Sequence, residues 1–351
     1  MIRILLATSR IDLQELLERA TRADMATQLL AVARNGSEAV TMARQLLPDV
    51  VAVDLRLDDD IAEAVMEIMV SAPAPIVMVS REDGIELGAR SDRALEAGAL
   101  AVIRAPSAAD GRLDTASAEK FLSTIKAMAQ VKVVRQWRRK AAGAPRTDPV
   151  APVAPAARDT PIGIVGIAAS TGGPAAIRSI LMKVSAAFPA PILVVQHMSN
   201  GFIDGVAASL DATVPMRVKV AADGERLRPG TVYLAPDGYQ LGVSGRSRIR
   251  VADDAPVDGF KPSGSYLFDS IARAFKDESL AVVLTGMGND GTEGLRLLRK
   301  AGGKAIAQDE TSSIVFGMPK SAIAAGLVDH VLPLDSIAAK IVALAGGRND
   351  A

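Results

Sequence analysis

Short apolar runs alternate with amphipathic stretches along residues 1–130. The apolar runs predict buried strands at Ile2–Ala7, Val50–Val53, Pro75–Val79 and Leu100–Ile103. Between these runs, apolar residues recur with helical spacing at Leu13–Ala20, Gly36–Leu46 and Asp92–Ala97. Strands that alternate with helices favour a parallel sheet that helices cover on both faces.

Residues 161–345 repeat this alternation on a larger scale. Strands are expected at Ile162–Ala168, Pro191–Val195, Thr231–Ala235, Gln240–Val243, Ser279–Leu284 and Lys304–Ala307. One helix is expected after Gly173-Pro174, and another is expected to run through Arg299. The third and fourth strands flank a turn sequence, which predicts a hairpin. The chain is therefore expected to be an α/β protein with two doubly wound, mostly parallel sheets and some antiparallel decoration.

A segment rich in Pro and Ala separates the two halves. It spans residues 141–160 without helical or strand periodicity, which predicts an extended linker. A basic cluster that contains the only Trp precedes it at residues 136–140. We interpret this cluster as the exposed end of a helix that starts near Ala118, with a docking element as the alternative. The predicted division is residues 1–130, a helix end and linker at 131–160, and a second domain at 161–345.

The amino-acid composition excludes several classes of function. Of the 351 residues, 49% are hydrophobic and 23% are charged, so each half can form a packed core. The formal net charge of zero gives no indication of a nucleic-acid partner. No apolar run reaches the ~18 residues of a membrane span. The apolar run at the N-terminus is too short for a signal peptide, so a cytoplasmic protein is expected. The absence of Cys excludes disulfides and a thiol nucleophile, and having only His197 and His330 excludes a His-rich metal site.

A glycine-rich turn after the first strand of the second half carries a serine. The sequence AASTGGP (168–174) places Ser170 between a strand and a helix, where two glycines permit a tight turn. Backbone N–H groups at the start of that helix could stabilise an oxyanion. Ala168 replaces the first Gly of the G-x-S-x-G elbow, and a phosphate-binding loop is the alternative. A P-loop is excluded because no Gly-Lys-Ser/Thr follows.

Two further strand ends carry a histidine and an aspartate. His197 directly follows a buried strand, where a structural role is the alternative, and His330 on a surface-facing strand is given no function. Asp290 lies in a glycine-rich turn and either caps the helix that starts near Gly291 or orients His197.

The three strand ends together indicate hydrolase chemistry. Parallel strands of one sheet end at the same edge, so Ser170, His197 and Asp290 could meet there. The chain order differs from the Ser-Asp-His order of α/β-hydrolases, but geometry defines a triad, and order does not. These residues favour an acyl-transfer hydrolase that needs neither a metal nor an organic cofactor.

The second half of the chain resembles the catalytic domain of the chemotaxis protein-glutamate methylesterases. The matching segments follow the family's order and are AASTGGP (168–174), QHM (196–198), RLRPGTVYLAPDG (226–238), KPSGSYLF (261–268), LTGMGNDGTEGL (284–295) and AQDETSSIVFGMPKSA (307–322). The resemblance implies that Ser170 is the nucleophile, His197 the general base and Asp290 the orienting acid. It also implies that Thr171 and Met287 line the site, with Met287 near the oxyanion.

The same resemblance implies a substrate. The family hydrolyses glutamate methyl esters on chemoreceptors, releases methanol, and can deamidate selected glutamines. Methyl-accepting chemotaxis receptors are therefore the expected partners, and a chemotaxis histidine kinase is a further candidate. No cofactor is implied.

The first half resembles a response-regulator receiver domain, which has a flavodoxin-like fold. Asp54, at the end of PDVVAVD (48–54), matches the phosphoacceptor. Thr8 and Ser9 occupy the positions of the acid pair that holds Mg²⁺, and Ala105 stands where a receiver has Lys. Phosphoryl transfer needs the charge of the phosphoryl group neutralised, so Asp54 is expected to be a poor phosphoacceptor and phosphorylation control to be lost or weakened.

Two other functions remain open. The chain could be a signalling scaffold with a degenerate receiver and an idle hydrolase fold, although the intact set of Ser170, His197 and Asp290 argues against this. It could also be an unrelated serine esterase or amidase for small molecules, which would turn over generic esters without a receptor.

Overall fold

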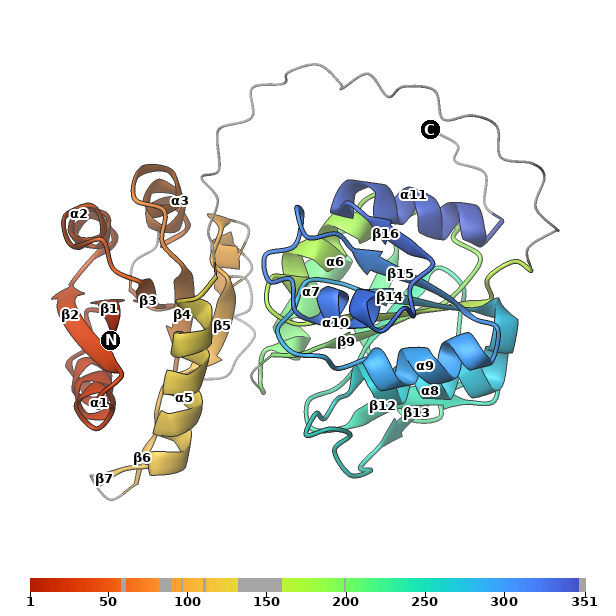
Figure 1. The fold of residues 1–351 in the computed structure, drawn as a ribbon, viewed down its shortest axis with the longest axis horizontal. Coiled ribbons are helices and arrows are strands. Elements are labelled where there is room, and N and C mark those ends of the chain that lie inside the picture. Colours follow the sequence, from red (N-terminus) through yellow and green to blue (C-terminus); the bar gives the residue numbers. More distant parts are fainter. Residues whose placement is uncertain are drawn as a thin grey trace, which may run out of the picture.

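The computed structural model describes residues 1–131 and 160–346, apart from residues 58–60, 82–89, 92, 96, 110–111 and 199. Within the described part of residues 1–131, five parallel strands form a sheet in the order β2-β1-β3-β4-β5 (Figure 1). These strands are β1 (Ile2–Ala7), β2 (Thr27–Ala33), β3 (Val50–Asp54), β4 (Ile76–Ser80) and β5 (Ala101–Arg104). The order is that of flavodoxin-like folds, so the predicted fold class is confirmed for this half.

Helices cover both faces of this first sheet. On one face lie α2 (Gly36–Leu46), α3 (Ile61–Ser71) and the described residues between 90 and 97, which are helical. On the other face lie α1 (Ile11–Arg22) and α5 (Thr115–Met128). A short antiparallel pair, β6 (Ala108–Ala109) with β7 (Arg112–Leu113), precedes α5. The sequence analysis did not predict β2 or α3, and β2 is a partly exposed strand at the edge of the sheet.

The second sheet is larger. Within the described residues of 160–346, seven parallel strands lie in the order β10-β11-β9-β8-β14-β15-β16. They are β8 (Ile164–Ala169), β9 (Ile192–Gln196), β10 (Arg217–Val220), β11 (Thr231–Leu234), β14 (Ser279–Val283), β15 (Lys304–Gln308) and β16 (His330–Leu332). This sheet confirms the second predicted α/β unit.

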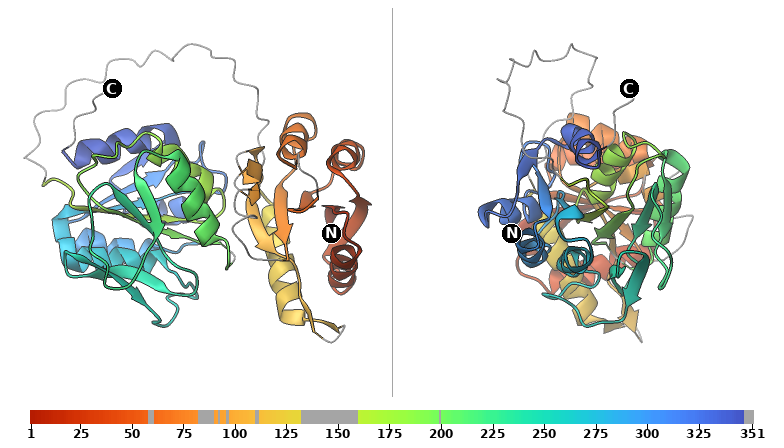
Figure 2. Two further views of the ribbon diagram at one scale, coloured as in Figure 1. Left: turned by 180° about the vertical axis from the view of Figure 1, so that it is seen from behind. Right: turned by 90° about the vertical axis from the view of Figure 1, so that its right-hand side faces the viewer.

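Helices and a hairpin cover the faces of the second sheet (Figures 1 and 2). One face packs against α6 (Gly173–Leu181), α7 (Ile203–Thr213) and α11 (Leu334–Leu344). The other face packs against α8 (Gly264–Phe275), α9 (Thr292–Lys300), α10 (Met318–Ala324) and the antiparallel strands β12 (Gln240–Ser244) and β13 (Arg248–Ala252), while a 3-10 turn, η1 (Lys276–Glu278), follows α8. The apolar core therefore fills the space on both sides of the sheet.

The predicted hairpin of Thr231–Ala235 with Gln240–Val243 is wrong. β11 instead runs parallel to β9 and β10 inside the main sheet, and β12 pairs with β13. The residues of β11 are buried throughout, as in an internal strand of a covered parallel sheet. β13 alternates buried and exposed residues over its first part, as the outer strand of a hairpin does.

The two halves are in contact through a small set of residues. Met198 and Phe202, which lie between the end of β9 and the start of α7, pack against the core between the first sheet and α2 and α3. The Gly172 N–H at the start of α6 donates a hydrogen bond of 3.3 Å to the Leu100 carbonyl of the N-terminal domain. The basic cluster at 136–140 and the predicted linker, apart from Thr160, lie outside the described residues. Among the residues described, no helix combines the length and apolar character needed to cross a membrane.

Candidate active site

The direction of the chain in the second sheet reverses beside β8. From β8 the chain moves to β9 on one side, whereas β14 lies on the other side of β8. Ligands in open α/β sheets bind beyond the carboxyl ends of the strands at such a switch point. Ser170 directly follows β8, His197 directly follows β9, and Asp290 lies on the loop after β14. The topology thus brings the three predicted residues to one edge.

Ser170 begins a tight turn that leads into α6. Its N–H donates to the Thr285 carbonyl (3.1 Å), and its own carbonyl accepts from Gly173 N (2.8 Å). Gly172, with φ +77° and ψ 0°, has the conformation of the third residue of a type II turn, where glycine is favoured. A side chain at Gly172 would also collide with Ile314, whose Cδ1 would lie 2.7 Å from the added Cβ. Gly172 is therefore required by the geometry of the tight turn that the sequence predicted.

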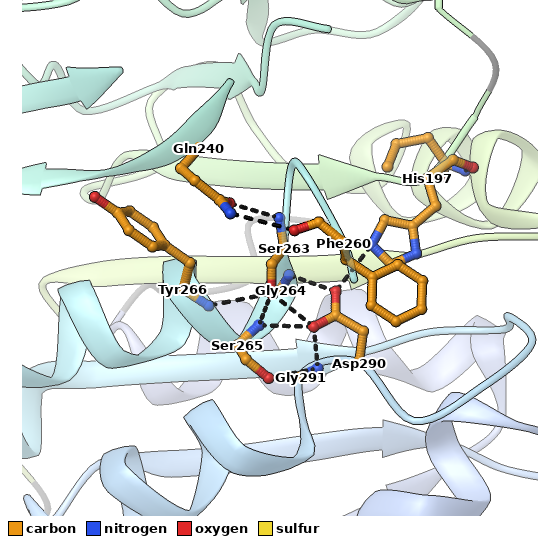
Figure 3. A network of polar contacts seen from close by, with 10 residues as sticks. His197, Gln240, Phe260, Ser263, Gly264, Ser265, Tyr266, Asp290 and Gly291 are labelled. Carbon is orange, nitrogen blue, oxygen red and sulfur yellow. Dashed lines mark hydrogen bonds and ion pairs between the residues drawn. The ribbon is translucent and has the colours of Figure 1, made fainter. Parts of the chain in front are cut away.

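His197 and Asp290 are paired. Nε2 of His197 lies 2.8 Å from Oδ2 of Asp290, and their side chains are 13% and 0% exposed (Figure 3). The two atoms are in close polar contact, but the direction of the ring N–H falls short of hydrogen-bond geometry within the described residues. Within the described residues the Ser170 hydroxyl makes no hydrogen bond. The structure therefore contains the contact between His197 and Asp290 but no hydrogen bond between Ser170 and His197. Catalytic hydrogen bonds are often loose in the absence of substrate.

The Asp290 carboxylate lies at the start of α8. Oδ1 accepts from the Ser263 hydroxyl (2.8 Å) and Ser265 N (3.1 Å), and Oδ2 accepts from Gly264 N (2.6 Å) (Figure 3). The positive end of the helix dipole adds to these bonds. The interpretation of Asp290 as the cap of the helix near Gly291 is therefore wrong, because α9 begins after Gly291 without a side-chain cap, whereas the carboxylate accepts from N–H groups at the start of α8.

These contacts set the protonation of Asp290. Burial by itself raises the pKa of Asp290. The interaction with His197 and the hydrogen bonds from Gly264 N and Ser263 outweigh burial, and the pKa of Asp290 lies below its usual value. The carboxylate is therefore ionised at neutral pH and can stabilise an imidazolium at His197.

Sequence reasoning missed two supports of this pair. Phe260 stacks on the His197 ring, with 4.7 Å between centroids and 6° between planes (Figure 3). The Ser263–Ser265 segment holds Asp290, as described above. The segment KPSGSYLF (261–268) was noted as a match, but nothing in its spacing indicates that it faces an aspartate that follows it by more than 20 residues in the chain.

The two residues predicted to line the site flank the Ser170 turn. Thr171 is 8% exposed, and its carbonyl accepts from the Thr285 hydroxyl (2.9 Å). Met287 is 48% exposed on the loop after β14. Within the described residues, neither the Thr171 N–H nor the Met287 N–H donates a hydrogen bond, so both remain available to a ligand.

The predicted phosphoacceptor is enclosed. Asp54 is 2% exposed, Oδ2 accepts from the Thr8 hydroxyl (2.7 Å), and Oδ1 accepts from Arg56 N (3.0 Å). Thr8 thus binds the aspartate directly at a position where an acid could have helped to hold Mg²⁺. Ala105 is buried and offers no charge. In the part of the chain that is described, no group of three His, Asp or Glu side chains is arranged to hold a metal ion.

Comparisons with known proteins agree with this architecture. The model of the CheB methylesterase family matches residues 165–341. The protein-glutamate methylesterase/protein-glutamine glutaminase of group 3 operon from Rhizobium meliloti is 69% identical over 100% of this chain and 98% of its own length. Protein-glutamate methylesterase/protein-glutamine glutaminase 4 from Myxococcus xanthus is 45% identical over 97% and 96% of the two chains.

A solved structure covers the second half. The crystal structure of the Thermotoga maritima CheB methylesterase catalytic domain is 40% identical, with a TM-score of 0.51, and covers 53% of this chain and 100% of that one. Fold and site define a two-domain α/β protein with Ser170, His197 and Asp290 at the switch point of its second sheet. The chain belongs to the CheB methylesterase family.

Proposed function

We propose that Ser170, His197 and Asp290 form the catalytic triad of a protein-glutamate methylesterase that also acts as a protein-glutamine glutaminase. The observation that carries the proposal is the 2.8 Å contact between His197 and a buried, ionised Asp290, at the sheet edge where Ser170 also lies. Family membership and the relatives' activities support the reaction.

The reaction follows from these roles. The Ser170 hydroxyl attacks the carbonyl of the glutamate ester while His197 takes its proton. With Nε2 turned towards Asp290, Nδ1 is the nitrogen left for this transfer. The imidazolium then protonates the leaving methoxide, methanol departs, and an acyl-enzyme ester remains on Ser170. Water, deprotonated by His197, hydrolyses this ester, which releases the glutamate carboxylate and restores the serine.

Backbone donors supply the oxyanion site in this proposal. The Thr171 N–H follows the nucleophile directly, in the position that serves as a donor in nucleophile elbows. The Met287 N–H, on the neighbouring strand end, is the second donor. Removing one oxyanion donor typically lowers the rate about 10²–10³-fold, so both N–H groups are expected to contribute substantially to catalysis.

The substrate is proposed to be methylated glutamates, and selected glutamines, of methyl-accepting chemotaxis receptors. The activities of the relatives and the absence of any membrane-crossing helix among the described residues are compatible with this role in the cytoplasm. We further propose that residues 1–130 form a regulatory domain, 131–160 a helix end and linker, and 161–345 the catalytic domain. No metal or organic cofactor takes part in the proposed reaction.

A covalent serine reagent tests the triad. A fluorophosphonate probe is expected to label wild type on Ser170, as read by mass spectrometry of the modified peptide. Labelling is expected to be lost in Ser170→Ala and to fall by more than about 100-fold in rate in His197→Gln. Equal labelling in His197→Gln, or labelling of another serine, would contradict the proposal.

Control of the enzyme by phosphorylation is proposed to be lost. The hydrogen bond from Thr8 to Asp54, the hydroxyl at Ser9 and the methyl at Ala105 support this, since none supplies the charge that phosphoryl transfer needs. A histidine kinase, if it binds the N-terminal domain, therefore acts as a docking partner and not as an efficient phosphodonor.

Restoring the missing charges tests this part. Wild type is expected to take up no phosphate at Asp54 from acetyl phosphate with Mg²⁺, measured by intact-protein mass. The triple variant Thr8→Asp, Ser9→Asp, Ala105→Lys is expected to take up one phosphate, and adding Asp54→Asn is expected to abolish it. Phosphate uptake at Asp54 by wild type, together with a rise in esterase activity, would refute the proposal.

A further inference from the structure

A buried glutamine links the nucleophile to the general base. Gln196, the last residue of β9, is 3% exposed. Its Nε2 donates to the Ser170 carbonyl (2.8 Å) and to the His197 carbonyl (2.9 Å). The side chain contributes no group to the triad, yet it contacts the backbone of two of its members.

The bond to the Ser170 carbonyl fixes a whole peptide plane. The peptide unit between Ser170 and Thr171 is planar and trans, so its carbonyl and its N–H point in opposite directions. Gln196 Nε2 and Gly173 N, each at 2.8 Å, hold the carbonyl on one side. The Thr171 N–H must then face the other side, where it makes no hydrogen bond within the described residues.

The second proposed oxyanion donor is fixed in the same way. The Gly286 carbonyl accepts from Gly317 N (3.1 Å) and Met318 N (2.9 Å). These bonds orient the Gly286–Met287 peptide and therefore the Met287 N–H. Both donors to the Gly286 carbonyl are backbone N–H groups. One of the two donors to the Ser170 carbonyl is the Gln196 side chain, which a substitution can remove.

The surroundings of Gln196 support a dedicated role. Its Oε1 is buried and has no hydrogen-bond partner among the described residues, which costs free energy that an apolar side chain would avoid. A Cβ at Gly173 would lie 2.0 Å from that oxygen, so the first turn of α6 is built to accommodate it. The positive end of the α6 dipole partly offsets the missing bond.

We infer that Gln196 is a positioning residue that aims the Thr171 N–H at the oxyanion of the tetrahedral intermediate. This inference rests on the proposed triad. It predicts that loss of the amide weakens binding of the transition state and leaves binding of the ground state nearly unchanged.

A tetrahedral analogue separates these two effects. The probe is a receptor peptide whose glutamyl ester carbonyl is replaced by a trifluoromethyl ketone, which adds the Ser170 oxygen to form a hemiketal oxyanion. Gln196→Met is expected to raise its inhibition constant about 10- to 100-fold and to lower kcat similarly, while KM for the methyl ester changes less than about threefold. The ¹⁹F signal is expected to show a raised hemiketal pKa, which a general loss of packing does not produce.

Gln308→Met is the matched control. Gln308 is equally buried at the end of β15, where Oε1 accepts from Thr285 N (2.8 Å) and Nε2 donates to the Ser312 carbonyl (2.7 Å). It contacts neither Ser170 nor His197, so its loss is expected to lower the melting temperature but to shift the inhibition constant less than about threefold. Should Gln196→Met not fold, Gln196→Glu keeps the size and loses the donors when ionised.

The outcomes are distinguishable. An unchanged ratio of inhibition constant to KM in folded Gln196 variants would overturn the inference and leave the triad proposal intact. Absence of a hemiketal on Ser170 in wild type would overturn the triad proposal, and the inference with it.

Discussion

Replacing Asp290 by Asn is a sharp perturbation because the two side chains have nearly the same shape. In the wild type, Oδ2 accepts from Gly264 N at 2.6 Å and faces His197 Nε2 at 2.8 Å. On the other side, Oδ1 accepts from Ser263 Oγ, Ser265 N and Gly291 N. An Asn side chain can place its single oxygen on only one of these sides.

The lower cost puts the oxygen on the Oδ1 side. The amide then points its own N–H groups at Gly264 N and at His197 Nε2. The clash with Gly264 N, and the loss of a charged acceptor for that N–H, cost about 2–3 kcal/mol of unfolding free energy. To accept from the amide, Nε2 must lose its proton and Nδ1 must carry it. The nitrogen that should accept the Ser170 proton is then blocked, and kcat is expected to fall by about 10⁴-fold.

Two assays measure these effects. Methanol release from a methylated receptor fragment gives kcat, and urea unfolding gives the free energy. Asp211→Asn is the control, since Asp211 accepts a hydrogen bond from Val218 N (2.7 Å) at the far end of α7 and contacts no site residue. A kcat for Asp290→Asn within about tenfold of wild type, with the fold retained, would refute the assigned role of Asp290.

The stability of the wild type also depends on pH through Asp290. Its pKa is lower in the folded protein than the ~3.9 of an unfolded aspartate. The ionised form therefore stabilises the fold above about pH 4, and this contribution is lost as pH falls through the folded pKa. The difference in unfolding free energy between wild type and Asp290→Asn is expected to be full at pH 7 and to shrink below pH ~4. A difference that grows on acidification would contradict this sign.

Three further changes test neighbouring features. Phe260→Leu removes the ring stacked on His197, a contact worth about 0.5–1.5 kcal/mol, and is expected to lower kcat/KM about 2- to 10-fold in a pH–rate profile, whereas an unaltered profile would argue that the stacking is incidental. Gly264→Ala places a Cβ 2.7 Å from that of Ala168 and is expected to lower the free energy of urea unfolding by about 1–3 kcal/mol; unchanged stability would mean that the helix start shifts freely. Phe202→Ser weakens the contact with the N-terminal domain, whose Leu100 carbonyl accepts a hydrogen bond from Gly172 N beside the nucleophile, and is expected to raise methanol release; a fall in activity with the fold intact would show that the contact assists catalysis.

The strand pattern predicted most of the two sheets because their internal strands are buried on both faces and read as continuous apolar runs. The same property misplaced β11. A short buried strand beside a turn looks like half of a hairpin, and only the long-range pairing with β9 places it in the main sheet. β2 was missed although residues 29–33 form an apolar run, because a short apolar run by itself does not distinguish a strand from part of a helix.

Local sequence patterns predicted the three candidate catalytic residues but not the residues that support them. Strand ends and glycine-rich turns pointed to Ser170, His197 and Asp290, and the structure brings the last two into contact. Phe260 and the start of α8 meet Asp290 and His197 only through the fold, so no local spacing indicates them. The hydrogen bond from Thr8 to Asp54 could not be predicted from the sequence either, although the sequence does show that position 8 lacks the acidic side chain of a receiver domain.

The central claim is that Ser170 carries the ester hydrolysis. The most direct measurement is methanol release from a methylated receptor signalling fragment by wild type and by Ser170→Ala, with circular dichroism to confirm that both are folded. The account predicts release by wild type and a loss of several powers of ten in the variant. Comparable release by both proteins would contradict it.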